Sequence, residues 1–303
     1  MLAIDIKNLT KTYKTGTKAL KGINLQVEEG DFFALLGANG AGKTTIIGIL
    51  TALVSKTAGQ VKVFEYDLDK NINQVKNQIG VVPQEFNFNM FEKVIDIIVA
   101  QAGYYGISRE IALPKANFLL EKLGLADKKN VVSRTLSGGM KRRLMIARGL
   151  IHEPRLLILD EPTAGVDVEL RHGMWEFLNE LNTKGTTILL TTHYLEEVEQ
   201  LCQNAAIIKE GQIIKNDSVK NLLKSLDKET YVIETENLSK QNLKLKSFKT
   251  NFIDVNTFEV IVEKKNSLNE LIMELSQANI KVNGIRPKGN RLEEMFLDIL
   301  SKK

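Results

Sequence analysis

The segment DFFALLGANGAGKT, residues 31–44, decides the fold of this chain. It begins with an apolar run that ends at Gly37, the pattern of a buried strand, and helical periodicity follows over residues 43–54. Between the two, GANGAGKT (37–44) fits the phosphate-loop pattern G-x-x-x-x-G-K-[ST]. In such a loop, glycines let backbone N–H groups approach phosphates, and the start of the helix adds positive potential. The segment therefore predicts an α/β fold with a site for nucleotide phosphates.

We expect this loop to bind a nucleoside triphosphate, with Lys43 reaching the β- and γ-phosphates and the Thr44 hydroxyl ligating Mg²⁺. The expected nucleotide-binding residues of the loop are Gly37, Ala38, Asn39, Gly40, Ala41, Gly42, Lys43, Thr44 and Thr45. Tyr13 lies in a strand-like piece well before the loop and could stack on the adenine. A tyrosine in a strand more often serves only in packing, so both interpretations stay open.

Three further segments place polar residues at the carboxyl ends of predicted strands, where α/β sheets bind their ligands. LLILDEP presents Asp160, a candidate Mg²⁺ ligand, followed by Glu161, the candidate to polarise an attacking water. Gln84 follows the strand-like IGVVP, and His193 ends the strand TTILLTTH. A strand-end histidine is more often structural than catalytic, but this one belongs to the expected nucleotide rim. The expected magnesium ligands are Thr44, Gln84 and Asp160.

A second glycine turn, LSGGMKRR (136–143), follows about a hundred residues later. Ser137 is a favourable N-cap for the amphipathic helix that comes next, and capping alone is the plain interpretation. Capping does not need two bare glycines, however, whereas exposed N–H groups at a helix start suit a γ-phosphate. One chain has little use for two phosphate cradles at one nucleotide. The basic run Lys141, Arg142 and Arg143 could approach a partner or the nucleotide, but a solvated helix face is the preferred interpretation.

The composition is that of a folded protein with one large domain or two: 303 residues, 43% hydrophobic, 26% charged, with five prolines. A net charge of +4 with dispersed basic residues does not predict nucleic-acid binding. Cys202 is the only cysteine, which excludes an intramolecular disulfide and a cysteine-based zinc site. The N-terminus lacks the apolar region of a signal peptide, and no uncharged apolar run reaches about 18 residues. We therefore expect a cytoplasmic protein that does not insert into a membrane.

Buried strands alternate with helices over residues 1–220, which predicts a nucleotide-binding domain built on a parallel α/β sheet. The alternating residues 2–27 are expected to form half-buried antiparallel strands, and residues from about 85 to 150 a helical subdomain. The expected helices span 92–103, 110–123, 138–150, 168–183 and 194–202, and a hairpin is expected at 205–216.

Residues 221–303 are expected to form a small α+β accessory domain, because the composition becomes polar and rich in lysine and asparagine after about residue 220. Its expected elements are a strand at 256–264, a helix at 268–280, a strand at 281–288 and a terminal amphipathic helix at 291–303 with Leu292, Met295, Phe296 and Ile299 on one face. A dimer clamp, a regulator and a simple stabiliser all fit such a domain.

In their order and spacing, GANGAGKT, Gln84, LSGGM, LLILDEP, AGVD (164–167) and His193 resemble the ATP-binding subunit of ABC transporters. The resemblance covers residues 2 to about 220. It implies a P-loop NTPase core with a mixed sheet, an antiparallel β subdomain and a helical subdomain. It also implies that two ATP-hydrolysing subunits meet head to tail, each ATP lying between one phosphate loop and the partner's LSGG segment. The signature residues Leu136, Ser137, Gly138, Gly139 and Met140 would then act on the partner subunit's ATP, which explains the second cradle.

The same resemblance implies a role for each remaining motif residue. Tyr13 would stack on adenine, and Gln84 would sense a transmembrane partner. Glu161 would be the catalytic glutamate, Asp167 the aspartate that couples the two sites, and His193 the histidine at the γ-phosphate. Met140 stands where a glutamine is commoner. Because a thioether cannot donate a hydrogen bond, any contact made by that glutamine must be absent or supplied otherwise.

A closer resemblance is to the ATPase subunits of type 2 ABC exporters, of the YadG-like multidrug type. It rests on LSGGMKRRL with DEPTAGVD, on HYLEEVEQLC, and on QEFNFN, QAGYYG and RLEEMF. This resemblance implies a homodimer that is peripheral on the cytoplasmic face of the membrane through a separate integral permease subunit. Phe86, Phe88 and Phe91 are then candidates to contact the permease's coupling helix, although a place in the core of the helical subdomain is an equal alternative.

A rival class shares these motifs but acts on DNA or ribosomes and transports nothing. Its DNA-repair members insert long coiled coils between phosphate loop and signature, whereas about 90 residues without sustained heptads separate them here. Its ribosome-acting members usually carry two ATPase cores per chain, and this chain has one set of motifs. An importer subunit would be suggested by a β-rich C-terminal barrel, which the helices expected after residue 266 disfavour.

Overall fold

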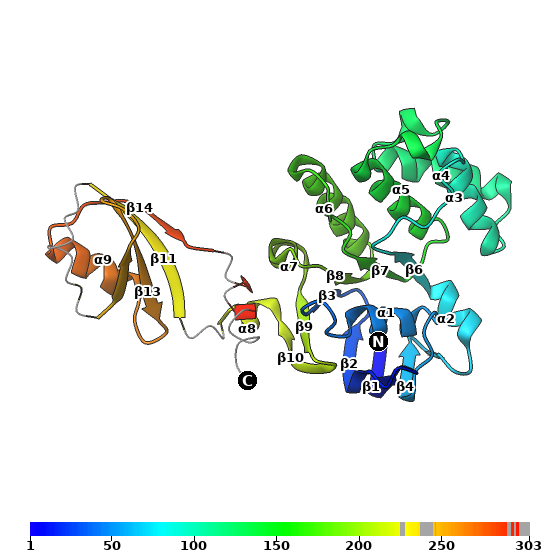
Figure 1. The fold of residues 1–303 in the computed structure, drawn as a ribbon. Helices are drawn as coiled ribbons and strands as arrows, with labels where there is room; N and C mark the ends of the chain where they lie inside the picture. Colours follow the sequence, from blue (N-terminus) through cyan, green and yellow to red (C-terminus); the bar gives the residue numbers. More distant parts are fainter. Residues whose placement is uncertain (225–227, 237–244, 246, 290–291, 294, 297–303) are drawn as a thin grey trace. The chain divides into compact units, whose positions relative to one another are not determined.

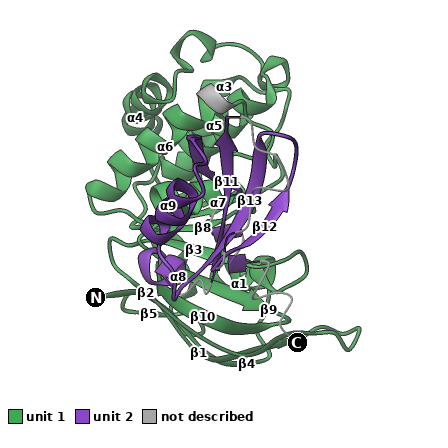
Figure 2. Cartoon of the chain, turned by 90° about the vertical axis from the view of Figure 1, so that its left-hand side faces the viewer, with its two compact units in different colours: residues 1–218 green, residues 219–303 purple. Residues whose placement is uncertain are grey.

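The computed structural model describes residues 1–303 except 225–227, 237–244, 246, 290–291, 294 and 297–303. The chain forms two compact units, residues 1–218 and residues 219–303, which Figure 2 colours separately. The first unit contains two sheets and the second contains one, and each unit has an apolar core of its own.

The first unit is built on a six-stranded sheet of order β10-β9-β3-β8-β7-β6. Its strands are β3 (Phe32–Leu36), β6 (Ile79–Val82), β7 (Leu156–Asp160), β8 (Thr187–Thr191), β9 (Asn204–Lys209) and β10 (Gln212–Ser218). All neighbours from β9 to β6 pair in parallel, and β10 alone pairs antiparallel, with β9. The sheet is therefore mixed, as expected. Every residue of β3, β7 and β8 is buried, which is why these strands are almost uninterrupted apolar runs.

A second, antiparallel sheet of order β2-β1-β4-β5 lies across helix α1 (Lys43–Leu50) from the central sheet (Figure 1). Its strands are β1 (Leu2–Thr12), β2 (Lys18–Glu28), β4 (Ala58–Val63) and β5 (Tyr66–Asp67). Ile46 and Ile49 of α1 are fully buried in one apolar cluster with Ile6 of β1 and Ile158 of β7. This packing fixes the helix that opens at the phosphate loop.

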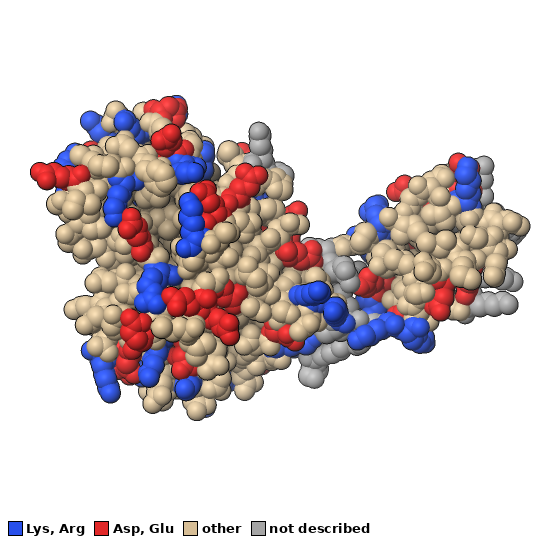
Figure 3. Space-filling model, turned by 180° about the vertical axis from the view of Figure 1, so that it is seen from behind, with Lys and Arg blue, Asp and Glu red and all other residues tan. Residues whose placement is uncertain are grey.

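The helices that follow α1 in the first unit are α2 (Ile72–Gln78), α3 (Val94–Tyr104), α4 (Arg109–Lys122), α5 (Gly138–Leu150), α6 (Val168–Thr183) and α7 (Leu195–Leu201), with short 3-10 turns at Ala126–Lys128 and Ser133–Thr135. Helices α3 to α7 follow the expected ranges closely, whereas α1 ends four residues before the expected residue 54 and α2 was not expected. Helices α3, α4 and α5 pack on one another beyond the β6 edge of the sheet (Figure 1). Among the described residues, no helix is long and apolar enough to cross a bilayer. Figure 3 shows lysine and arginine interspersed with aspartate and glutamate over one face of this unit.

The second unit contains an antiparallel sheet of order β12-β13-β11-β14, on which helix α9 packs. Its elements are α8 (Val219–Lys224), β11 (Lys228–Thr235), β12 (Lys249–Phe252), β13 (Thr257–Glu263), α9 (Leu268–Gln277) and β14 (Val282–Pro287). Leu271 and Leu275 of α9 are buried with Phe258 and Val260 of β13. A capping box between Ser267 and Glu270 starts α9. Residues 291, 294 and 297–303 of the predicted terminal helix, including Ile299, lie outside the described residues.

Candidate nucleotide site

The carboxyl ends of β3, β8, β7 and β6 meet at one edge of the central sheet, because these neighbours are all parallel. β3 leads into the phosphate loop, β8 into the segment with His193, and β6 into the segment with Gln84, while β7 ends at Asp160. A pocket of about 630 Å³ opens at this edge. Its lining residues, all predicted from the sequence, are Asn39, Gly40, Gly42, Lys43, Thr44, Thr45, Gln84, Asp160, Glu161 and His193.

The phosphate loop depends on glycine at two positions. Gly40 and Gly42 have φ angles of 79° and 119°, which L side chains rarely adopt. A Cβ at Gly42 would also lie 2.9 Å from the Leu20 side chain. The Lys43 ammonium donates hydrogen bonds to the carbonyl oxygens of Gly37 (2.6 Å) and Ala38 (3.2 Å). Burial lowers the pKa of Lys43, and the nearby carboxylates of Glu161 and Asp160 oppose that lowering.

Asp160 is held in place by a residue that the sequence did not single out. The Thr191 hydroxyl donates a 2.5 Å hydrogen bond to Asp160 Oδ1, and both side chains are buried. Asp160 and Thr191 are cross-strand partners in the register of β7 and β8. Only that pairing reveals the contact, because nothing in the sequence distinguishes Thr191 from Thr187, the other threonine of β8. The bond fixes the orientation of a carboxylate at the pocket wall.

Glu161, which follows β7, contacts side chains from the segments that follow β6 and β8. Its Oε2 accepts a 3.1 Å hydrogen bond from Gln84 Nε2 and lies 3.3 Å from His193 Nδ1. Its backbone N–H donates to the Thr191 carbonyl oxygen at 2.9 Å, and its φ is 51°. A non-glycine residue in this region costs about 1–3 kcal/mol and persists only where its surroundings enforce it. The Glu161 side chain is 13% exposed and that of His193 is 57% exposed, so the histidine is the more open to a ligand.

Tyr13 lies beside the phosphate loop but does not line the pocket. It directly follows β1 instead of belonging to the strand, and it is 37% exposed. Its hydroxyl lies 3.2 Å from Thr45 Oγ1, and the Lys11 ammonium lies 4.9 Å from its ring centre. The tyrosine therefore leaves part of its surface open next to the helix that carries Thr44 and Thr45. Gly37, Ala38 and Ala41 shape the loop without lining the pocket.

The signature segment, residues 136–140, does not line this pocket either. Ser137 caps α5, its Oγ accepting a 3.3 Å hydrogen bond from the Met140 backbone N–H. Ser137 and Gly138 are exposed, and a Cβ at Gly138 would meet nothing within 4 Å. Asp167, the exposed residue before α6, also lies off the pocket. The second cradle is thus built at a helix start, with open space over its first glycine.

The prediction of a solvated basic face on α5 was wrong for two of its three residues. Arg142 is only 4% exposed, and its guanidinium donates 2.8 Å hydrogen bonds to the carbonyl oxygens of Pro83 and Gln84. Arg143 donates to the Leu123 carbonyl oxygen at 2.7 Å. The signal in the sequence was spacing: Arg142 precedes the buried Met145 and Ile146 by three and four positions, which places it on the same helix face.

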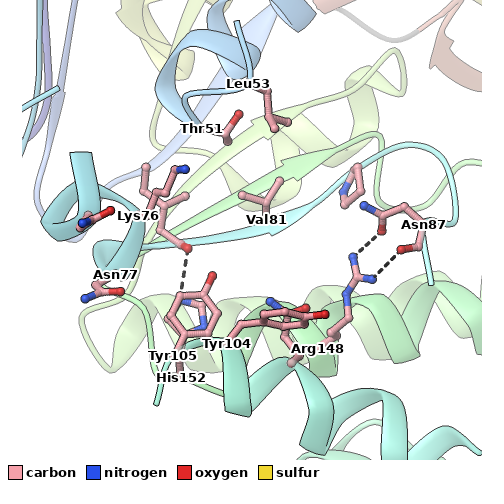
Figure 4. Close-up of a pocket in the computed structure, with 15 residues that line it drawn as sticks. Thr51, Leu53, Lys76, Asn77, Val81, Asn87, Tyr104, Tyr105, Arg148 and His152 are labelled. Carbon is pink, nitrogen blue, oxygen red and sulfur yellow. Dashed lines mark hydrogen bonds between the residues drawn. The ribbon is translucent and has the colours of Figure 1, made fainter. Parts of the chain in front are cut away.

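A second pocket, of about 640 Å³, lies between α2, β6, α3 and α5 (Figure 4). The rings of Tyr105 and His152 stack there with centres 3.6 Å apart. A His152 ring nitrogen lies 3.1 Å from the Ile79 carbonyl oxygen, and burial lowers the pKa of His152 to about 4. Arg148 bonds to the Asn87 carbonyl and side chain across the pocket. The sequence did not predict this pocket.

The three phenylalanines that were candidates for a permease contact do not line the second pocket. The Phe86 and Phe88 rings are partly buried with centres 6.2 Å apart, while Phe91 is 74% exposed. Phe91 is therefore not a core residue. Asn87, which lies between Phe86 and Phe88, lines the second pocket, and so does Pro83.

Comparisons of the sequence and of the structure with known proteins point to the same family. Residues 20–164 match the ABC transporter family. The chain is 39% identical over 223 residues to the Nod factor export ATP-binding protein I of Burkholderia orbicola, covering 73% of each chain. It is 36% identical over 229 residues to the linearmycin resistance ATP-binding protein of Bacillus subtilis, covering 76% of this chain and 73% of that one. A dimeric ATP-binding cassette bound to ADP and phosphate after hydrolysis superposes with a TM-score of 0.66 at 27% identity, over 71% of this chain and 98% of that chain.

Proposed function

Since the chain belongs to the ATP-binding subunits of ABC transporters, we propose that it hydrolyses MgATP between two copies of itself and drives a separate membrane permease. The observation that carries this proposal is the convergence of Gln84 and His193 on one oxygen of Glu161, inside the pocket that the phosphate loop lines. Positioning and charge stabilisation supply most of the catalysis in phosphoryl transfer, and the lysine, carboxylates and histidine that line this pocket suit both tasks.

The pocket residues suit MgATP by their chemistry. A hydroxyl, an amide and a carboxylate, from Thr44, Gln84 and Asp160, line one pocket, and such oxygen ligands are those that Mg²⁺ prefers. Bound there, the ion would neutralise phosphate charge. Lys43 and the loop N–H groups would hold the β- and γ-phosphates. The exposed face of Tyr13 would take the adenine.

Glu161 would orient the attacking water and accept its proton, because both Gln84 and His193 contact its carboxylate in the pocket. His193, the more exposed of the pair, would contact the γ-phosphate. The partner's Ser137, Gly138 and Gly139 would close the site from the other side, with Leu136 buried beneath them and Asp167 at the contact between subunits. In this assignment the exposed signature segment contacts the ATP bound by the partner, since it does not line the nucleotide pocket of its own chain.

We further propose that the permease seats its coupling helix in the second pocket. The pocket borders the loop after Gln84, so its occupant would contact the segment that enters the nucleotide site. Export is inferred from the two relatives, one named for export of Nod factors and one for linearmycin resistance. The subunit would then work peripherally, on the cytoplasmic face of the membrane that holds the permease.

Replacement of the proposed catalytic glutamate tests the chemistry. We expect Glu161→Gln to lower the ATP turnover by about 10²–10⁴-fold, the range for loss of a general base, and to accumulate an ATP-bound dimer. The exposed Glu196 serves as a control, and Glu196→Gln should hydrolyse normally. Near-normal turnover of the Glu161→Gln protein would refute the assignment.

Co-purification tests the proposed role in transport. Tagged Glu161→Gln protein, expressed in its native host and solubilised with ATP present, should retain a stoichiometric integral membrane protein. Recovery of ribosomes or nucleic acid, with no membrane protein, would instead favour the class that acts on those partners.

A further inference from the structure

We propose that Arg142 is a positioning residue for Gln84: it fixes the loop that carries the glutamine to helix α5, and so links the signature end of α5 to the nucleotide pocket of the same chain. The proposal rests on the proposed function only for the role of Gln84 in hydrolysis. It adds a residue outside the pocket that controls where that glutamine lies.

Arg142 grips the loop at two consecutive carbonyl groups. Its two terminal nitrogens donate separately to Pro83 and Gln84, each at 2.8 Å, and its guanidinium carbon lies 5.2 Å from the centre of the Phe86 ring. The planar fork of an arginine can hold two acceptors in a fixed geometry, which the point charge of a lysine cannot. Arg142 Nε is buried and makes no hydrogen bond within the described part of the chain. The loop carbonyls are therefore what satisfies this buried cation.

From Arg142 a short chain of contacts reaches the reacting centre. The guanidinium holds the Gln84 carbonyl, and the Gln84 side chain donates to Glu161 Oε2 at 3.1 Å. The positive charge of Arg142 also interacts electrostatically with Asp160 and Glu161. Ser137, which begins α5, precedes Arg142 by five residues on one continuous helix. A movement of α5 must then displace the signature cradle and the Gln84 loop together.

A second arginine holds the far end of the same loop. Arg148, also on α5, donates to the Asn87 carbonyl at 3.1 Å and to the Asn87 side chain. Gln84 lines the nucleotide pocket, whereas Pro83 and Asn87 line the second pocket (Figure 4). Loop 83–87 thus contributes residues to both pockets, and Arg142 and Arg148 bond it to α5. A molecule bound in the second pocket could therefore displace Gln84 by moving this loop.

A double-mutant cycle tests whether Arg142 acts through Gln84. We expect Arg142→Met to lower kcat for ATP about tenfold, within the coupling range of neighbouring residues, with little change in KM. In a Gln84→Ala background the same substitution should change kcat by less than about twofold. Arg142→Lys, which keeps the charge and one donor, should restore part of the lost rate. The matched control is Arg143→Met, which removes a carbonyl-bonded arginine from the same helix but leaves the loop untouched.

Equal loss of kcat with and without Gln84 would overturn the proposal, because Arg142 would then act by stability or charge alone. The proposal would also fail if Arg143→Met lowered kcat in the natural background but not in the Gln84→Ala background, as Arg142→Met is expected to do. If Arg142→Met does not fold, the cycle is run with Arg142→Lys, and additive effects on kcat would overturn the proposal in the same way. A Gln84→Ala protein with normal turnover would instead contradict the role of Gln84 in the proposed function, which separates the two failures.

Discussion

At the scale of single residues, His152 is a titratable side chain whose charged form the fold excludes. Its ring is stacked on Tyr105, one nitrogen faces the Ile79 carbonyl, and the buried Nδ1 has no hydrogen-bond partner among the described residues. Protonation would leave a cation there with an N–H that nothing accepts. This is why burial lowers the pKa to about 4 from an ordinary value near 6.5. The imidazole is accordingly neutral at pH 7.

His152 should therefore make folding sensitive to mild acid. Because its folded-state pKa lies below its unfolded-state pKa, the unfolded chain binds more protons, and stability is lost as the pH falls from about 6.5 towards 4. We expect the free energy of unfolding to drop by about 2 kcal/mol more between pH 7 and pH 5 in the natural protein than in His152→Gln. Denaturant titrations at the two pH values measure the difference, and equal drops would contradict it.

Which site residues the sequence can predict depends on whether their role is local. Asp160 ends an apolar strand and Gln84 and His193 follow two others, and parallel strands place their ends together, so the meeting of these three residues could be expected. Thr191 and Arg142 could not be found in this way. Their partners are set by strand register and by helix-to-loop packing between residues far apart in the chain.

At the scale of elements, strand β6 and helix α5 approach each other through glycine. A Cβ at Gly80 would lie 2.3 Å from the Gly149 carbonyl oxygen and 2.7 Å from the Pro154 ring. A Cβ at Gly149 would lie 3.3 Å from the Val81 carbonyl oxygen. This close approach brings α5 near enough to the end of β6 for Arg142 to reach the Gln84 loop. The spacing of the two elements is thus part of the site.

Gly80→Ala should disturb that spacing. The added methyl overlaps backbone atoms that cannot rotate away, so we expect a loss of about 1–3 kcal/mol in the free energy of unfolding, together with a lower kcat. Gly173→Ala is the matched control, because Gly173 is an exposed α6 position with nothing within 4 Å of a Cβ. There the change should stabilise by about 0.5–1 kcal/mol. Unfolding and ATPase assays on both variants decide, and an unchanged Gly80→Ala protein would count against the argument.

Helices and strands whose own residues show a clear apolar pattern could be predicted from the sequence, and those without one could not. The apolar strands and the amphipathic helices α3 to α7 were found close to their observed bounds. β4, β5, α2, α8 and β12 were not predicted. β5 has two residues and β12 has four, and each exists because it pairs with a strand elsewhere in the chain. Such pairing is decided by tertiary contacts and leaves little periodic signal.

At the scale of the whole molecule, the proposed dimer gives the two phosphate cradles of one chain different pockets to serve. The phosphate loop lines the nucleotide pocket, and the exposed signature segment does not. Closed two-fold symmetry would then form two equivalent composite sites, each taking Lys43 from one subunit and Ser137 from the other. A lesion in either residue, carried by both subunits, removes both sites.

Mixing two inactive variants tests this arrangement directly. Lys43→Ala should abolish phosphate binding, and Ser137→Arg should block the signature face that meets the partner. In a mixed dimer both lesions fall in one composite site, and the other site receives a natural Lys43 and a natural Ser137. With random pairing in a 1:1 mixture, about half of the dimers are mixed, and each mixed dimer has one intact site of its two. ATPase activity should therefore return to about a quarter of that of the natural protein. Each variant alone should stay inactive. If the signature served its own chain's nucleotide, every site in the mixture would carry a lesion, and no activity would return.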